Sequence, residues 1–181
     1  MHLRRLTPWA LFVAISVSSL FATSAVPRKS PEFTIVEASG KVTPLSTLKG
    51  RVVVIEFLLT NCPHCMRVAQ TITKLYAELG AQGFQPIGIA FDKSVDGKRT
   101  ADFSQLLGIN FPVGYCTSET VDNYLGRKPA ERLMVPQLVV IDRQGVIRAQ
   151  SRPIGEPNLE NADYLRNLIE TLLRESGGQH H

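Results

Sequence analysis

The stretch VVVIEFLLTNCPHCMR, residues 52–67, places two cysteines, separated by two residues, directly after an apolar run. Apart from Glu56, the run is continuously apolar and rich in β-branched residues, which predicts a central strand buried on both faces. Pro63 falls where a helix would begin, because a proline in the first helical turn loses no hydrogen bond and its fixed φ suits a helix. We therefore expect a strand that leads directly into a helix, with Cys62 at the junction.

The rest of the chain alternates between strand and helix signals. The β-hairpin expected over residues 33–50 has its turn at Ser39-Gly40. The elements expected after the first strand are a helix over 63–79, a buried strand over 84–92, a short helix over 100–108, a short strand over 111–116, a helix over 118–126 capped by Ser118, a hairpin over 134–151 and a final helix over 161–176. This order predicts a three-layer α/β fold, with a mixed central sheet, helices on both faces and an N-terminal β-hairpin.

The final helix has a marked apolar stripe at helical spacing. Its members are Tyr164, Leu165, Leu168, Ile169, Leu172 and Leu173. A stripe of this kind is expected to pack flat on a sheet.

The first 25 residues have the pattern of an export signal. MHLRR is a short basic segment, residues 6–22 are mostly apolar, and TSA ends at Ala25 with small residues that a signal peptidase accepts. An uncleaved membrane anchor is the alternative, and either reading places the rest of the chain in the periplasm or outside the cell. We expect a linker over 26–31, the folded domain over 32–176 and a disordered tail over 177–181.

Composition narrows the function classes. The chain has 181 residues, of which 44% are hydrophobic and 20% charged, and this balance is typical of one folded domain with a short extension. The formal net charge is +4, and no predicted helix face gathers a cluster of lysine and arginine. We therefore expect no nucleic-acid partner, and contact with a membrane only if the N-terminal segment stays uncleaved.

The spacing of the two cysteines suggests redox chemistry. Cys62 is expected at a helix N-terminus, where free N–H groups and the helix dipole stabilise a thiolate. Cys65 lies one turn later on the same side, within disulfide reach but covered by the helix. His64 adds a hydrogen-bond donor and, when protonated, a positive charge that favours the same thiolate. The pattern predicts that Cys62 attacks and Cys65 resolves.

Glu56 is unusual because it interrupts a strand that otherwise appears fully buried, six residues before Cys62. A buried carboxyl without a partner should have a raised pKa, and below the helix start it could serve Cys65 as a general acid or base. The alternative is that Glu56 points to the sheet edge or pairs with a basic residue such as Lys74.

Three features together resemble the thioredoxin fold: VVVIEFLLTNCPHC at 52–65, VPQLVVIDRQG at 135–145 and the C-terminal amphipathic helix. The N-terminal hairpin and the segment FDKSVDGKRTADFSQLLGINFPVGY at 91–115 resemble the exported TlpA/ResA-like branch. The resemblance implies a thiol:disulfide oxidoreductase, in which Cys62 is the nucleophile, Cys65 the resolving cysteine and Glu56 the buried acid. Pro136 would be the cis-proline opposite the disulfide, and Val135 would offer backbone groups to a bound substrate chain.

The motif also bears on the partner and on the direction of electron flow. Asn61 stands where the family usually has tryptophan, so the surface that meets a partner is more polar. Pro63, next to Cys62, belongs to the same surface. The Pro63-His64 dipeptide resembles that of DsbA-type oxidases, whereas TlpA/ResA-like proteins mostly reduce specific partners, and the direction stays open. The resemblance implies protein thiols and disulfides as partners, in cytochrome c maturation or envelope disulfide handling, with a membrane thiol-disulfide electron donor if the protein reduces. No dissociable cofactor is implied.

Three other uses of the cysteine pair are considered. A structural disulfide would close so short a loop that it removes little chain entropy. A copper or zinc carrier would use Cys62, Cys65 and His64, but zinc usually needs four ligands. A peroxiredoxin-like peroxidase expects proline and threonine at set distances before its cysteine, whereas Thr60 is one position out and Ile55 replaces the proline.

Cys116 and the aspartates after residue 91 have simple structural interpretations. Cys116 is either a buried small residue or a third redox thiol. Asp92, Asp96 and Gly97 lack the ligand spacing of a calcium loop, so this segment is expected to be a solvated turn.

Overall fold

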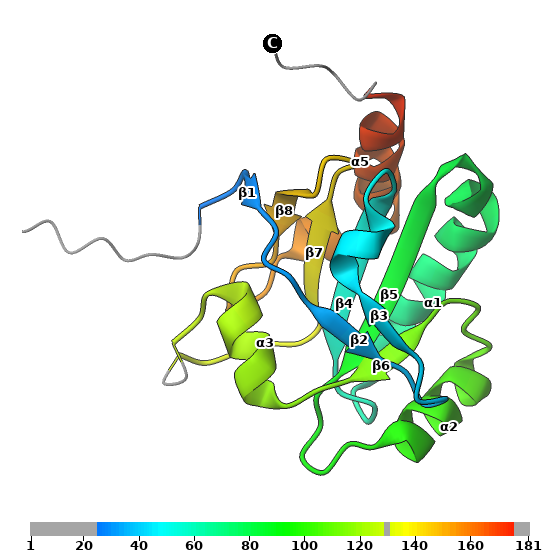
Figure 1. Ribbon diagram of the computed structural model, residues 1–181, viewed down its shortest axis with the longest axis vertical. Helices are drawn as coiled ribbons and strands as arrows, with labels where there is room; N and C mark the ends of the chain where they lie inside the picture. The colour runs from blue at the N-terminus through cyan, green and yellow to red at the C-terminus, as the bar shows by residue number, and fades with distance from the viewer. Residues whose placement is uncertain (1–24, 129–130, 176–181) are drawn as a thin grey trace, which may run out of the picture.

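The computed structural model describes residues 25–128 and 131–175. Its centre is a six-stranded mixed sheet in the order β1-β8-β7-β4-β5-β6. In that order the strands are Arg28–Lys29 (β1), Val146–Gln150 (β8), Gln137–Ile141 (β7), Val52–Leu58 (β4), Phe84–Ala90 (β5) and Val113–Tyr115 (β6). The central strand β4 runs parallel to β5 and antiparallel to β7, so the predicted mixed sheet is confirmed (Figure 1).

Helices cover both faces of this sheet. The helices are α1 (Pro63–Leu79), α2 (Gly97–Leu107), α3 (Ser118–Leu125), α4 (Pro157–Glu160) and α5 (Ala162–Arg174), with short 3-10 turns η1 (Leu45–Leu48) and η2 (Gly80–Gln82). The apolar side chains of α1, α2, α4 and α5 join one core cluster, and those of α3 join the other. The predicted hairpin is formed by β2 (Thr34–Val36) and β3 (Val42–Pro44), and it covers the α3 face over the central strands (Figure 1).

The strand β4 divides the two halves of the core. Successive side chains of a strand point to opposite faces. Val54 and Leu58 therefore join the cluster under α1, while Ile55 and Phe57 join the cluster under α3. All seven residues of β4 are buried, which confirms the prediction of a strand covered on both faces.

Two predicted helix starts are corrected by capping contacts. The helix α2 begins at Gly97, earlier than expected, because the Asp96 carboxylate accepts a hydrogen bond from the N–H of Arg99 at 2.8 Å. In α3 the cap is Thr117 and not Ser118, since the Thr117 hydroxyl accepts from the N–H of Thr120. A cap needs an extended backbone and a side-chain acceptor at the residue before the helix, which Thr117 supplies.

The final helix packs largely as predicted. Leu165, Ile169 and Leu172 are buried in the core. Tyr164 is wrongly placed in the buried stripe, because its side chain is 47% exposed. It lies in the first turn of α5, where a tyrosine tolerates water at its hydroxyl end.

The segment expected to be a linker, residues 26–31, takes part in the sheet. Arg28 and Lys29 pair with Ile147 and Val146 of β8, and the N–H of Ser30 donates to the carbonyl of Gly145 at 2.9 Å. The backbone pairing thus fixes this segment at the sheet edge. The expected signal or anchor and the expected tail fall almost wholly in residues 1–24 and 176–181, which lie outside the described residues. Across residues 25–128 and 131–175, no helix has the length and apolarity needed to cross a membrane.

Candidate active site

The two cysteines lie at the start of α1, at the carboxyl end of β4. Cys62 is the N-cap residue, and its Sγ accepts a hydrogen bond from the N–H of Cys65 at 3.2 Å. Pro63 occupies the first helical position, as predicted. Cys62 is partly exposed and Cys65 is fully buried, and both are free thiols. Of this pair, Cys62 is therefore the cysteine that the solvent reaches directly.

Burial changes the acidity of the other two cysteines. Burial raises the pKa of the Cys65 thiol, and the neighbouring sulfur of Cys62 and carboxyl of Glu56 add to the effect. Cys65 is thus held in its protonated form. Burial also raises the pKa of Cys116, to about 12, so this third thiol is a poor nucleophile near neutral pH.

Glu56 is buried at the centre of the sheet. It pairs with Gly88 of β5 and Leu138 of β7, and neither carboxylate oxygen has a hydrogen-bond partner in the described part of the chain. Its side chain shares the α1 face of β4, two residues from Leu58 on the same side. Burial raises the pKa of Glu56 well above the usual value, and the charges of Cys62 and Glu160 raise it further. The alternative of a sheet-edge position or a pair with Lys74 is therefore wrong.

His64 has a partner that the sequence did not suggest. Its Nε2 lies 2.8 Å from Oε2 of Glu160, the last residue of α4. The Glu160 side chain is only 14% exposed, whereas that of His64 is 46% exposed. Residues 64 and 160 are far apart in the chain, so no local pattern could have indicated this contact.

The predicted cis-proline is present. The peptide bond from Val135 to Pro136 is cis, and Pro136 is buried directly before β7. Val135 packs against the same core cluster as Cys62. Asn61 and Pro63 are exposed beside Cys62. The structure thus brings the predicted partner-facing residues to the same end of the sheet as the cysteines.

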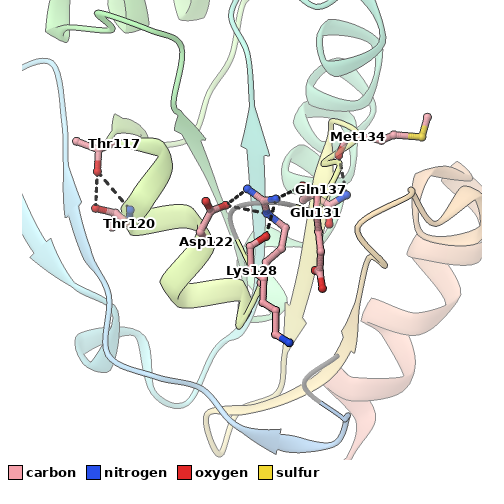
Figure 2. A network of polar contacts seen from close by, with 8 residues as sticks. Thr117, Thr120, Asp122, Lys128, Glu131, Met134 and Gln137 are labelled. Atoms are coloured by element: carbon pink, nitrogen blue, oxygen red, sulfur yellow. Dashed lines mark hydrogen bonds and ion pairs between the residues drawn. The ribbon is translucent and has the colours of Figure 1, made fainter. Parts of the chain in front are cut away.

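Polar contacts link α3 to residues 127, 128 and 131, and others lie around the cis-proline (Figure 2). Arg127 and Asp122 form an ion pair whose side chains are only 8% and 9% exposed. The Arg127 guanidinium also donates to the carbonyls of Lys128 and Glu131. Nearer the cis-proline, Nε2 of Gln137 donates to the carbonyl oxygens of Met134, at 2.7 Å, and Arg152, at 3.1 Å.

Asp92 was expected in a solvated turn, but it supports the loop before Cys62. Its carboxylate accepts hydrogen bonds from the N–H and the hydroxyl of Thr60, and its side chain is 6% exposed. The carboxyl ends of the parallel strands β4 and β5 meet at one sheet edge. The position of Asp92 just after β5 was a signal that sequence reasoning missed.

No set of three or more histidine, cysteine, aspartate or glutamate side chains in the described ranges is arranged to hold a metal ion. His180 and His181 lie outside those ranges.

The chain is similar in sequence and in fold to known thiol:disulfide oxidoreductases. The thiol-disulfide oxidoreductase ResA of Bacillus thuringiensis (strain Al Hakam) is 25% identical over 144 residues, which cover 79% of this chain and 78% of that protein. ResA of Halalkalibacterium halodurans is 27% identical over 134 residues, 72% of each chain. A solved thioredoxin-family thiol:disulfide interchange protein from Chlorobium tepidum TLS has a TM-score of 0.67 at 23% identity, covering 82% of this chain and 98% of that one.

The fold, the cysteine pair and these relatives define the class, a thiol:disulfide oxidoreductase built on the thioredoxin fold. The chain belongs to the AhpC/TSA family, whose model matches residues 26–150. The resemblance to ResA-like proteins and the predicted fold class are confirmed.

Proposed function

We propose that the protein exchanges disulfides with partner proteins through Cys62 and Cys65, with Cys62 as the attacking thiolate. One observation carries this assignment: a partly exposed sulfur at a helix N-terminus lies next to a buried thiol and a buried, unpartnered carboxyl. The free N–H groups of the helix end favour negative charge on Cys62, the sulfur that a partner can reach.

The exchange proceeds in two displacements. The Cys62 thiolate attacks one sulfur of a partner disulfide, so that the partner S–S bond breaks, a mixed disulfide forms and the other partner sulfur leaves as a thiolate. Cys65 then loses its proton to the Glu56 carboxylate and attacks Cys62. The mixed disulfide breaks, Cys62 and Cys65 become a disulfide, and two electrons have passed to the partner. The reverse sequence oxidises a partner dithiol.

Glu56 suits the proton transfer because its pKa and that of Cys65 are both raised by burial. A carboxylate with a raised pKa is a stronger base, so it takes the proton of a weakly acidic thiol more readily. Glu56 and Cys65 are both fully buried, so the protein itself supplies a proton acceptor on the same side of the sheet as the thiol.

Partner recognition falls to the residues around Cys62. Val135, before the cis-proline, would offer its backbone to the partner chain next to the reacting sulfur, and Asn61 and Pro63 would contact it from the other side. The electrons remain in the two cysteines, and no dissociable cofactor is needed.

The proposed setting is outside the cytoplasm, in cytochrome c maturation or in envelope disulfide handling. The signal-like residues 1–25 and the likeness to ResA support this setting. A membrane thiol-disulfide donor would recharge the protein if it works as a reductase. The equilibrium potential against glutathione tests the direction: a value near the DsbA value of about −120 mV would favour an oxidase, and one near the thioredoxin value of about −270 mV a reductase.

Insulin reduction by single-cysteine variants tests the assignment. Cys62→Ser is expected to abolish turnover, and Cys65→Ser to accumulate mixed disulfides with the substrate. Cys116→Ser is the matched control and should keep wild-type turnover. Normal turnover by Cys62→Ser and Cys65→Ser would overturn the proposal, and consumption of hydroperoxides in place of disulfide exchange would favour the peroxidase alternative.

A further inference from the structure

The contact between His64 and Glu160 joins the dipeptide between the two cysteines to a different part of the chain. His64 is the second residue of α1, and Glu160 ends α4, which follows the β7-β8 hairpin. The 2.8 Å separation of their polar atoms is within hydrogen-bonding range. The fold thus places the Glu160 carboxylate next to the imidazole of His64, between the two cysteines in the sequence.

We propose that Glu160 is a positioning residue of the redox site: its carboxylate holds His64, two residues after Cys62 in the chain, as an imidazolium and so makes the cysteine pair more oxidising. The inference rests on the proposed role of Cys62 as the reactive thiolate. Glu160 does not touch the reacting sulfur in this scheme, and its favourable effect on the thiolate is exerted through the imidazole.

The backbone around Glu160 is well fixed. The preceding residue, Leu159, is 2% exposed and packs in the core below α1. The following residue, Asn161, caps α5 by accepting a hydrogen bond from the N–H of Tyr164 at 3.0 Å. A short helix held on both sides presents the Glu160 carboxylate in a constant direction, so the imidazole gains a fixed partner.

The charges of Glu160 and His64 have opposite effects on the Cys62 thiolate. The titratable groups gathered here are Glu56 of β4, Cys62, His64 and Cys65 of α1 and Glu160 of α4, and His64 is the one among them that can carry a positive charge. Glu160 alone would disfavour a thiolate, just as its charge raises the pKa of Glu56. Paired with His64, it instead favours the charged form of the imidazole, which attracts the Cys62 thiolate.

These two effects have opposite signs, and a double-mutant cycle separates them. In the wild-type background, Glu160→Gln keeps the shape and a hydrogen-bond acceptor for a neutral imidazole but removes the charge that stabilises an imidazolium. In the His64→Ala background, only the direct repulsion between Glu160 and the thiolate remains. The same substitution should therefore act in opposite directions.

The experiment measures the dithiol–disulfide equilibrium of the full folded domain against glutathione at neutral pH. Glu160→Gln is expected to shift it about tenfold toward the disulfide, which lowers the potential by about 30 mV for a two-electron couple. In the His64→Ala background, Glu160→Gln should shift it toward the dithiol. The matched control is Glu156→Gln, which lies in the same segment and pairs with Arg152, and it should leave the equilibrium unchanged.

The pH midpoint of the ultraviolet thiolate absorbance gives a second readout, which needs no partner protein. Glu160→Gln should raise this midpoint in the wild-type background and lower it in the His64→Ala background. Shifts of the same sign in both backgrounds, or no shift in either, would overturn the role given to Glu160. Because this titration does not depend on turnover, it separates that outcome from a failure of the proposed disulfide exchange in the insulin assay.

Discussion

The carboxylate of Asp92 receives both the backbone N–H and the hydroxyl of Thr60, at 3.0 and 2.9 Å. Through these contacts the end of β5 fixes the loop that carries Cys62. The two residues lie just after the ends of the neighbouring parallel strands β4 and β5, so the position of the reactive sulfur depends on the pairing of these strands.

Loss of this contact should loosen the loop. Asp92→Ala leaves two donors of Thr60 without their partner, which is expected to lower the free energy of unfolding by about 1–3 kcal/mol. The rate of insulin reduction should fall more than the stability alone explains. Denaturant unfolding and insulin turnover check this, with Asp102→Ala as the control, because the exposed ion pair of Asp102 with Lys98 contributes at most about 1 kcal/mol. Equal effects of the two variants would contradict the role of Asp92.

Glu56 should make the protein less stable as the pH rises. Its pKa is higher in the folded chain than the value of 4.5 expected in the unfolded chain, so the folded state keeps a proton that the unfolded state releases. The free energy of unfolding then falls as the pH rises above that value, by about 1.4 kcal/mol for each unit between the two pKa values. Glu56→Gln should be more stable than the wild type at neutral pH, and the gain should vanish below pH 4.5. Thermal unfolding at several pH values measures the difference.

Glu56→Gln should also slow the second displacement. Without the carboxylate, Cys65 has no proton acceptor in the core, and general-base contributions of about 10²-fold or more are typical. The first attack by Cys62 should be little changed, so a mixed disulfide should accumulate. Stopped-flow reaction with a small disulfide, quenched with acid, resolves the two steps, and an unchanged second step would rule out proton transfer to Glu56.

The buried ion pair of Arg127 with Asp122 should be costly to break from one side. Asp122→Ala leaves an uncompensated guanidinium that is 8% exposed, with an expected loss of about 3–5 kcal/mol. The double variant Asp122→Ala with Arg127→Met should recover part of this loss, because the unpaired charge is gone. Denaturant unfolding of both single variants and of the double variant gives the coupling free energy between the two side chains. Additive losses of unfolding free energy would show that the two side chains do not interact.

Cys116 should react slowly with alkylating reagents. Burial raises its pKa to about 12, so its thiolate is scarce near neutral pH, whereas Cys62 is partly exposed at a helix N-terminus. Mass spectrometry after brief iodoacetamide treatment of the reduced protein should find Cys62 modified first, with Cys116 and the fully buried Cys65 modified much more slowly. Rapid labelling of Cys116 would favour its interpretation as a third redox thiol.

The junction of strand and helix was predictable because its signals are local. The unbroken apolar run before Asn61 and the proline at 63 fix the end of β4 and the start of α1 within a few residues. Glu56, the one acidic residue within this run, was visible for the same reason. The buried stripe of α5, apart from Tyr164, could be read from its own periodicity.

The contacts that support the site were not predictable in this way. Asp92 and Glu160 depend on which strands are neighbours and on where a short helix returns to α1, and neither is encoded in a nearby pattern. The edge strand at Arg28–Lys29 is too short to show a period, so it was taken as a linker. The cap at Thr117 had a second hydroxyl residue beside it, and the choice depends on backbone angles alone.

The central position of β4 has a consequence for dynamics. Both edges of this strand are paired, with β5 and with β7, and both faces are covered, so its amide hydrogens should exchange only through global unfolding. Glu56 therefore belongs to the slowest-opening unit of the molecule. Partner proteins of different shape that bind at Cys62 should therefore leave Glu56 in its place.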